Sequence, residues 1–189
     1  MEKETWKGTI NLISEDLNRL SKCQTFREGV IKFITNYSFK ITTLFRICSY
    51  MAAQGIIMRA INILPNLLLR YYQRKYGILL APGTKIRGGL TFPHFGNIII
   101  NGGVIIGKNA TIFQGVTIGS VRGKGVPKIG NNVVISPNSI LIGNITIGNN
   151  VFIGAGSVVT KSFPDNVTIA GNPAKIINNN GIYNCNCYI

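Results

Sequence analysis

The residue best suited to chemistry is the only histidine of the chain, His94, in the segment LTFPHFGNIIING. An imidazole with the reference pKa of about 6.5 accepts a proton near neutral pH, so we expect His94 to act as a general base. Between residues 29 and 164 there is no Asp or Glu that would serve instead. The alternative is a purely structural histidine, buried and hydrogen-bonded.

The element that must position this histidine has a period of six residues. Aliphatic residues recur at every sixth position in two stretches: Ile100, Ile106, Ile112 and Ile118, then Ile129, Ile135, Leu141, Ile147, Ile153 and Val159. This period fits neither a helix nor an alternating strand, but it fits short strands that turn corners and stack in coils, as in a parallel β-helix. His94 lies on the same period. Because side chains fill such coils, we expect chemistry on the outside, where subunits meet.

Corners are expected at glycine and asparagine residues, which tolerate the backbone angles of tight turns. Examples are Gly107, Gly130, Gly148, Asn132 and Asn150. The six-residue spacing fails once, because Ile118 and Ile129 are 11 residues apart. This irregularity predicts an extruded loop over residues 119–128, either functional or simply solvated.

Three segments follow from these patterns. Residues 1–78 are expected to be helical, with acids early and a basic residue late in ISEDLNRL and with Gly77 as a C-terminal cap. Residues 79–177 are expected to form the β-helix, whose open end needs a cover. Residues 178–189 are expected to be a loose polar tail.

The charge of the chain favours anionic partners. It has 20 Lys and Arg against 6 Asp and Glu, a net charge of +14, which attracts nucleic acid, anionic lipid or a phosphate-rich cofactor. The basic residues are spread over both halves without a recognised motif, so we expect no nucleic-acid partner. The basic, apolar stretch 50–80 fits either a membrane surface or an ordinary helical cap.

The lack of a recognisable signal peptide or membrane span and the cysteine content both indicate a cytoplasmic protein. No stretch resembles a signal peptide or reaches the roughly 18 apolar residues of a membrane span. We therefore expect a cytoplasmic protein, with peripheral contact at the inner face of the membrane as an open alternative. Four cysteines do not form a disulfide framework in a chain of this length. Cys185 and Cys187 lack further ligands, so no metal is expected.

Residues 79–177 carry a more specific set of motifs. They are GTKIRGGLTFPHFGNIII, IFQGVTIG, VPKIGNNVVISPNSILIGNITIGNNVFIGAGSVVTKSFPDN and AGNPAKII, in this order. This region resembles the hexapeptide-repeat acyltransferases, and within them the serine acetyltransferase branch. The resemblance implies a left-handed parallel β-helix, acetyl-CoA as co-substrate, and a homotrimer with active sites between subunits.

The same resemblance assigns roles to individual residues. His94 aligns with the catalytic base, which takes the proton of an acceptor hydroxyl while the oxygen attacks the thioester. Backbone amides near Gly119 and Ser120 would stabilise the oxyanion. The positions implied for CoA are Ala155, Thr160, Lys161 and Lys175, with Arg122 and Lys124 as further phosphate ligands. For each basic residue, an ordinary solvated charge is the alternative.

Three departures from the serine enzymes bear on the acceptor. Leu79 and Pro93 replace acids that accompany the catalytic histidine, and Val126 replaces a second histidine. Serine carries two charges, and leaving either unpaired in a closed site is costly. We therefore expect a neutral sugar hydroxyl of a surface polysaccharide or its lipid-linked precursor. We then expect the chain to resemble the colanic-acid and capsular O-acetyltransferases within this family, and we expect a backbone carbonyl to orient His94.

Two other functions stay open. One is a serine O-acetyltransferase of cysteine biosynthesis, and the other is a non-catalytic β-helix scaffold in which His94 is buried. A metal enzyme of the carbonic anhydrase type is remote, because such a site needs three histidines and the chain has one.

Overall fold

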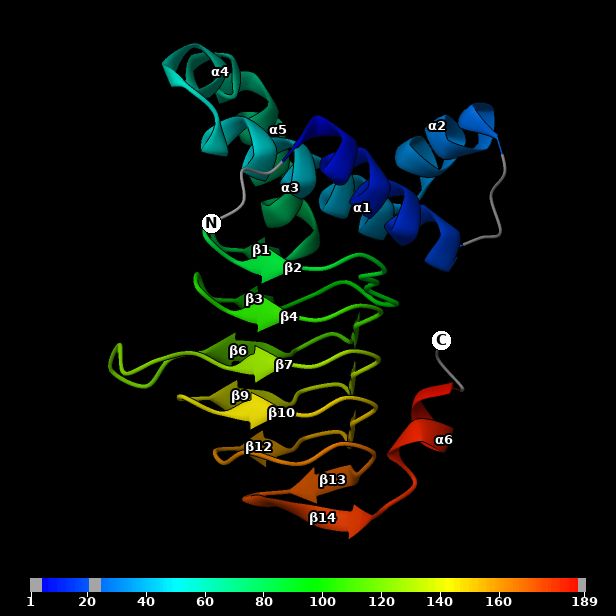
Figure 1. Ribbon diagram of the computed structural model, residues 1–189, viewed down its shortest axis with the longest axis vertical. Coiled ribbons are helices and arrows are strands. Elements are labelled where there is room, and N and C mark those ends of the chain that lie inside the picture. Colours follow the sequence, from blue (N-terminus) through cyan, green and yellow to red (C-terminus); the bar gives the residue numbers. More distant parts are fainter. Residues whose placement is uncertain (1–4, 21–24, 187–189) are drawn as a thin grey trace.

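A computed structural model describes residues 5–20 and 25–186 of the chain. It is a tall prism of stacked coils, with a bundle of helices across one end and a short helix along its side (Figure 1). The helices of the bundle are α1 (Trp6–Leu20), α2 (Phe26–Thr35), α3 (Tyr37–Ala53), α4 (Ile56–Ile61) and α5 (Ile63–Tyr76). We call these five helices the helical cap.

Three sheets form the faces of the prism. Sheet A contains β1 (Ile78–Leu80), β3 (Ile98–Ile100), β6 (Thr117–Gly119), β9 (Ile140–Ile142) and β12 (Val158–Val159). Sheet B contains β2 (Lys85–Ile86), β4 (Ile105–Ile106), β7 (Lys128–Ile129) and β10 (Thr146–Ile147). Sheet C contains β5 (Thr111–Ile112), β8 (Val134–Ile135), β11 (Phe152–Ile153), β13 (Thr168–Gly171) and β14 (Ala174–Asn178). Neighbouring strands are parallel, except that β14 returns antiparallel to β13. The predicted parallel β-helix with an N-terminal helical segment is confirmed.

The six-residue period fills the interior of the prism. Every residue of the period, from Ile100 to Val159, is buried, with at most 3% of its surface exposed. The strands pair in register, so that Ile100 lies over Ile118 and Ile118 lies over Leu141. Each aliphatic side chain therefore packs on the one from the coil above, which gives one continuous apolar column.

At the corner between sheets B and C, glycine does not have the expected role of supplying the turn angle. Asn132 and Asn150 have φ of 55° and 55°, so asparagine supplies the left-handed turn residues here. Gly107 and Gly130 have no positive φ. They are needed because coils approach closely: a Cβ at Gly107 would lie 2.5 Å from the backbone carbonyl of Gly130. At this corner, asparagine makes the turn and glycine permits the stacking.

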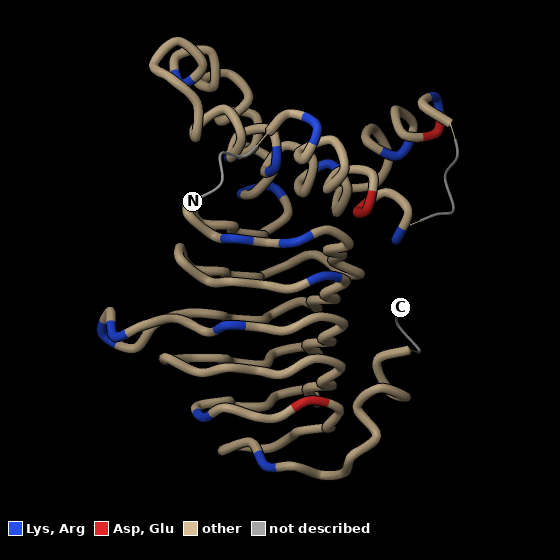
Figure 2. Tube along the Cα trace, viewed as in Figure 1, with Lys and Arg blue, Asp and Glu red and all other residues tan. Residues whose placement is uncertain are grey.

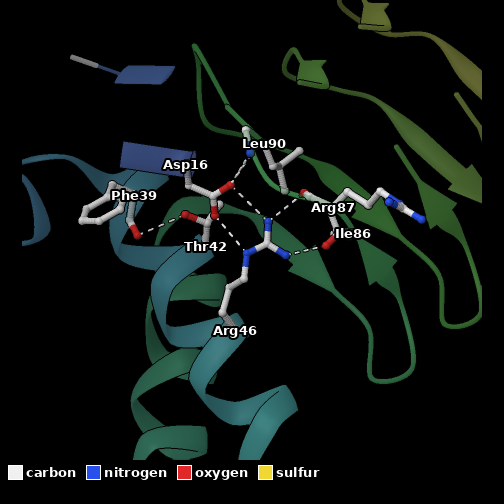
Figure 3. A network of polar contacts seen from close by, with 8 residues as sticks. Asp16, Phe39, Thr42, Arg46, Ile86, Arg87 and Leu90 are labelled. Atoms are coloured by element: carbon white, nitrogen blue, oxygen red, sulfur yellow. Dashed lines mark hydrogen bonds and ion pairs between the residues drawn. The ribbon is translucent and has the colours of Figure 1, made fainter. Parts of the chain in front are cut away.

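The helical cap is joined to the first coil by a buried ion pair (Figure 3). Asp16 of α1 accepts bonds from Arg46 of α3, with Nε–Oδ2 of 3.0 Å and Nη2–Oδ1 of 3.1 Å. The same carboxylate accepts the backbone N–H groups of Gly89 and Leu90, at 2.8 and 3.0 Å. Burial raises the pKa of Asp16, while the Arg46 charge and these hydrogen bonds oppose the rise. Arg46 also donates to the carbonyl of Arg87, so cap and prism share one polar network.

The expected loose tail is wrong for part of its length. Residues Gly181–Asn186 form α6, which packs beside β11 on sheet C. Cys185 is fully buried, and Asn184 donates from Nδ2 to Thr168 Oγ1 at 2.8 Å. So short a helix has no periodic signal in the sequence, because one buried side chain and close backbone packing hold it in place.

Candidate active site

His94 lies on the turn that connects sheet C to sheet A in the first coil, after Thr91 and before β3. Its side chain is exposed, and its ring centre is 6.0 Å from that of Phe113, one coil below. An exposed imidazole on a corner can reach a substrate. The scaffold alternative required a buried and satisfied histidine, which this placement does not provide.

Among residues 5–20 and 25–186, the structure shows no hydrogen bond to either ring nitrogen of His94, so the expected backbone carbonyl partner is absent there. Its neighbours on the chain are fixed instead. Tyr37 donates to the carbonyl of Pro93, and Phe92 donates its N–H to Ser38 Oγ.

Sequence reasoning missed Gln114, which occupies the same corner one coil below His94. The N–H of Gly115 donates to Gly96 across these two coils at 2.9 Å. The side-chain oxygen of Gln114 is buried, and it has no hydrogen-bond partner in the described part of the chain. A buried polar atom without a partner is rare and costly, which marks this corner as unusual. The sequence signal was present in IFQGVTIG, as a polar residue next to an inward-facing position.

The extruded loop starts at the opposite edge of sheet A. β6 ends at Gly119 and β7 begins at Lys128, and the segment between them projects away from the prism (Figure 1). Its tip is a tight turn in which Lys124 N–H donates to Val121, and Arg122 has φ of 49°. Basic residues lie at this tip, and no acidic residue accompanies them (Figure 2). Arg122 and Lys124 are exposed, as phosphate contacts need to be.

The other predicted CoA residues lie at the two edges of sheet A and, in the case of Lys175, on sheet C. Ala155 is exposed at the sheet C to sheet A corner, on the edge where His94 lies. Thr160 and Lys161 follow β12 and are exposed on the edge where the loop lies, with Lys161 Nζ 5.6 Å from the ring centre of Phe163. Lys175 is exposed on β14 at the far end of the prism.

Sheet A therefore separates the predicted base from the predicted oxyanion amides. His94 precedes β3, whereas Gly119 ends β6, whose Ile118 pairs with Ile100. Within one chain, His94 lies before the start of β3 and Gly119 at the end of β6, with the three residues of β3 between the two levels. Three residues of extended chain correspond to about 10 Å.

The three residues that depart from the pattern of the serine enzymes differ in their surroundings. Leu79 faces outward from sheet A, Pro93 is exposed, and Val126 packs against the core. The described residues contain no group of three or more His, Cys, Asp or Glu side chains placed to hold a metal. Cys187 lies outside the described residues, so its pairing with Cys185 is not described.

The hexapeptide pattern of the sequence matches a known protein family, and relatives that match most of the chain are also found. Residues 127–161 match the family model of the bacterial transferase hexapeptide, six repeats. A serine acetyltransferase of Staphylococcus xylosus is 33% identical over 175 residues, which covers 91% of this chain and 79% of the relative. A serine acetyltransferase of Synechococcus elongatus is 33% identical over 136 residues, covering 70% of this chain and 56% of the relative.

Solved structures agree with these matches. Serine acetyltransferase from Brucella abortus in complex with coenzyme A has a TM-score of 0.75 and 25% identity, covering 91% of this chain and 68% of that one. The Neisseria gonorrhoeae serine acetyltransferase in complex with serine has a TM-score of 0.67 and 25% identity, covering 92% of this chain and 70% of that one. These similarities contradict the predicted polysaccharide acceptor and do not support the expected closeness to colanic-acid and capsular enzymes.

Proposed function

The chain belongs to the serine acetyltransferase family of hexapeptide-repeat transferases and is an acetyl-CoA-dependent acyltransferase, and we propose that its acceptor is the hydroxyl of free serine. The observation that carries the proposal is the match of 33% identity over 91% of this chain. A match of that length includes the helical cap as well as the hexapeptide coils.

In the proposed reaction, His94 removes the proton of the serine hydroxyl as the oxygen forms a bond to the thioester carbon. Backbone N–H groups near Gly119 and Ser120 of a neighbouring copy stabilise the oxyanion of the tetrahedral intermediate. The carbon–sulfur bond then breaks, and the imidazolium returns its proton to the CoA thiolate. The exposed position of His94 on a corner supports this role.

The proposed CoA contacts come from exposed side chains. Arg122 and Lys124 on the extruded loop, with Lys161 and Lys175, would bind phosphates, because charge-assisted hydrogen bonds to phosphate are strong. Ala155 and Thr160 would line the pantetheine path. Replacing Lys161 by alanine should raise the KM for acetyl-CoA and leave kcat nearly unchanged.

The proposed assembly is a homotrimer with the site between subunits. Sheet A supports it, because three of the outward residues that stack on it are apolar and exposed in the single chain, Leu79 47%, Ile99 40% and Ile140 37%, with Thr117 between the last two. Burying these apolar residues between copies is favourable by the hydrophobic effect. It would also bring the loop of one copy toward the His94 corner of the next.

Subunit mixing tests this arrangement. His94→Asn and a variant lacking residues 120–127 should each be inactive. When the two are unfolded together and refolded, mixed trimers regain activity if base and loop belong to different copies. A mixture that stays inactive, although mass spectrometry shows mixed trimers, would contradict a shared site.

The acceptor is tested by product analysis. Acetyl-CoA and serine with purified protein should give O-acetylserine, detected by mass spectrometry. Because no carboxylate occupies positions 79 or 93, we expect weak binding of the serine ammonium and hence a high KM for serine. Absence of O-acetylserine at saturating serine, while acetyl-CoA still binds, would overturn the proposed acceptor.

Membrane contact through residues 50–80 stays a second, separate prediction. No helix among the described residues is both long enough and apolar enough to cross a bilayer. On α4 and α5, Ile56, Ile57 and Leu64 are largely exposed, and the same two helices carry the exposed Arg59 and Arg70. This combination favours an anionic lipid surface. Sedimentation with vesicles containing anionic lipid, compared with neutral vesicles, tests it, and equal or no binding would contradict it.

A further inference from the structure

We infer that Tyr37 is a positioning residue for His94, an inference that rests on the proposed role of His94 as the base. Tyr37 is the first residue of α3, and its side chain reaches the His94 turn. Its hydroxyl oxygen lies 2.6 Å from the carbonyl oxygen of Pro93 and 3.0 Å from that of Phe92. A tyrosine hydroxyl has one hydrogen to donate, which these two carbonyls share.

Ser38, the next residue of α3, binds a backbone N–H group of the same stretch. Ser38 is almost fully buried, and its Oγ accepts the N–H of Phe92 at 2.9 Å. The first turn of α3 therefore binds both the donor and the acceptor groups of the two residues that precede His94. Asn36 caps this turn by accepting the N–H of Phe39 at 2.9 Å, which keeps Tyr37 in place.

The chain beyond His94 is held by the same helices. The ring of Phe95 meets Tyr37 edge-on at 5.3 Å and lies 5.9 Å from Tyr76 of α5. Ile98 N–H donates to the carbonyl of Gly77, the residue that ends α5, at 2.9 Å. His94 therefore sits in the middle of a short turn that is anchored to the helical cap on both sides.

This arrangement explains how a base can be oriented without an acid beside it. The imidazole has no hydrogen-bond partner among the described residues, so its direction follows from the backbone of residues 92–95 and the rotamers that this backbone allows. Tyr37 fixes that backbone through two carbonyls. Burial raises the pKa of Tyr37, so its hydroxyl stays protonated, and able to donate, at neutral pH.

Removing the hydroxyl tests the inference. Tyr37→Phe keeps the ring contacts with Phe95 but loses the donor. A misplacement of the reacting group by about 1 Å costs up to about 100-fold in rate, so we expect kcat to fall by about 10- to 100-fold with the KM for acetyl-CoA unchanged. Tyr72→Phe is the matched control, because Tyr72 belongs to the same aromatic group but has no described contact with the turn. It should leave kcat nearly unchanged.

A second measurement reports on position without using activity. His94 is the only histidine, so untagged protein gives a single set of imidazole signals by NMR. Tyr37→Phe should shift these signals and broaden them, and Ser38→Ala should do the same by releasing Phe92. Tyr72→Phe should leave them unchanged.

The two readouts separate the two proposals. If the wild type makes no O-acetylserine but Tyr37→Phe still moves the His94 signals, the acceptor assignment fails and the positioning role stands. If the wild type is active and Tyr37→Phe alters neither kcat nor the His94 signals, the positioning role is wrong.

Discussion

Replacing Asp16 by alanine should lower the free energy of unfolding by about 3–5 kcal/mol, the usual cost of removing one partner of a buried ion pair. Asp16 is fully buried, and the Arg46 side chain is 4% exposed. Without the carboxylate, the Arg46 guanidinium keeps only backbone carbonyl acceptors, from Ile86 and Arg87. The cation would remain buried without a counter-charge.

The magnitude follows from counting the groups that lose a partner. The Asp16 carboxylate accepts two N–H groups from Arg46 and the backbone N–H groups of Gly89 and Leu90. Each buried amide left unsatisfied costs about 1–3 kcal/mol. These costs overlap with the loss of the ion pair, so they support the upper part of the range and are not added to it. Against a typical total stability of about 5–15 kcal/mol, the loss is large.

Denaturant unfolding at one fixed protein concentration measures the effect. Glu15→Ala is the matched control, since Glu15 neighbours Asp16 in sequence but pairs with Lys108 in solvent, both side chains being more than 40% exposed. That variant should cost about 0–1 kcal/mol. A loss below about 1 kcal/mol for Asp16→Ala, equal to that of the control, would refute the idea that this pair holds the cap on the prism.

Three further outcomes concern stability and thiol chemistry. Asn150→Ala should cost about 2–3 kcal/mol in thermal unfolding, because it loses two side-chain hydrogen bonds and places alanine at φ of 55°. Burial raises the pKa of Cys48 and of Cys185 to about 11, so both should resist alkylation at pH 8 until the protein unfolds, as seen by mass spectrometry. Hydrogen bonds from Asn149 lower the pKa of Asp165, so its stabilising effect should be present at neutral pH and be lost as pH falls below the ordinary value of 3.8.

Each of these outcomes has its own control. Asn144→Ala, at an exposed position without left-handed backbone, should leave the melting temperature nearly unchanged. Rapid alkylation of Cys48 in the folded protein would contradict its burial. In Asp165→Asn the stability should depend less on acid than in the wild type. An unchanged acid dependence would show that this carboxylate contributes nothing.

The interior of the prism was predictable from the sequence because one physical constraint repeats. A residue that points into a narrow column must be aliphatic. The period from Ile100 to Val159 is therefore visible in the sequence even when the fold is unknown. The helical cap was predictable as helical for similar reasons, with Gly77 in the expected left-handed C-cap at φ of 62°.

Contacts between distant segments were not predictable. The bonds from Tyr37 to the His94 turn span 55 and 56 residues, and the Asp16–Arg46 pair spans 30. A single sequence carries no periodic mark of such contacts. The structural role of α6 escaped for the same reason, since it depends on a close approach between Gly181 and the backbone of Val167.

The acceptor was predicted wrongly because the prediction relied on the charges of a few single positions. Leu79, Pro93 and Val126 remove groups that the resemblance implied for serine, and the absence of carboxylates between residues 29 and 164 seemed to exclude an ammonium. The similarity to serine acetyltransferases over 91% of the chain outweighs three positions. Charged recognition can also come from groups that the local motifs do not reveal.

The most direct test of the account is the rate of thiol release from acetyl-CoA with serine as acceptor, measured for the wild type beside His94→Asn. Loss of a general base should lower the rate by about 10² to 10⁴, with unchanged thermal stability because the His94 side chain is exposed. Serine-dependent release in the wild type that falls by this factor in the variant is the predicted result. Equal release by both proteins would contradict the central claim that His94 is the base of this transferase.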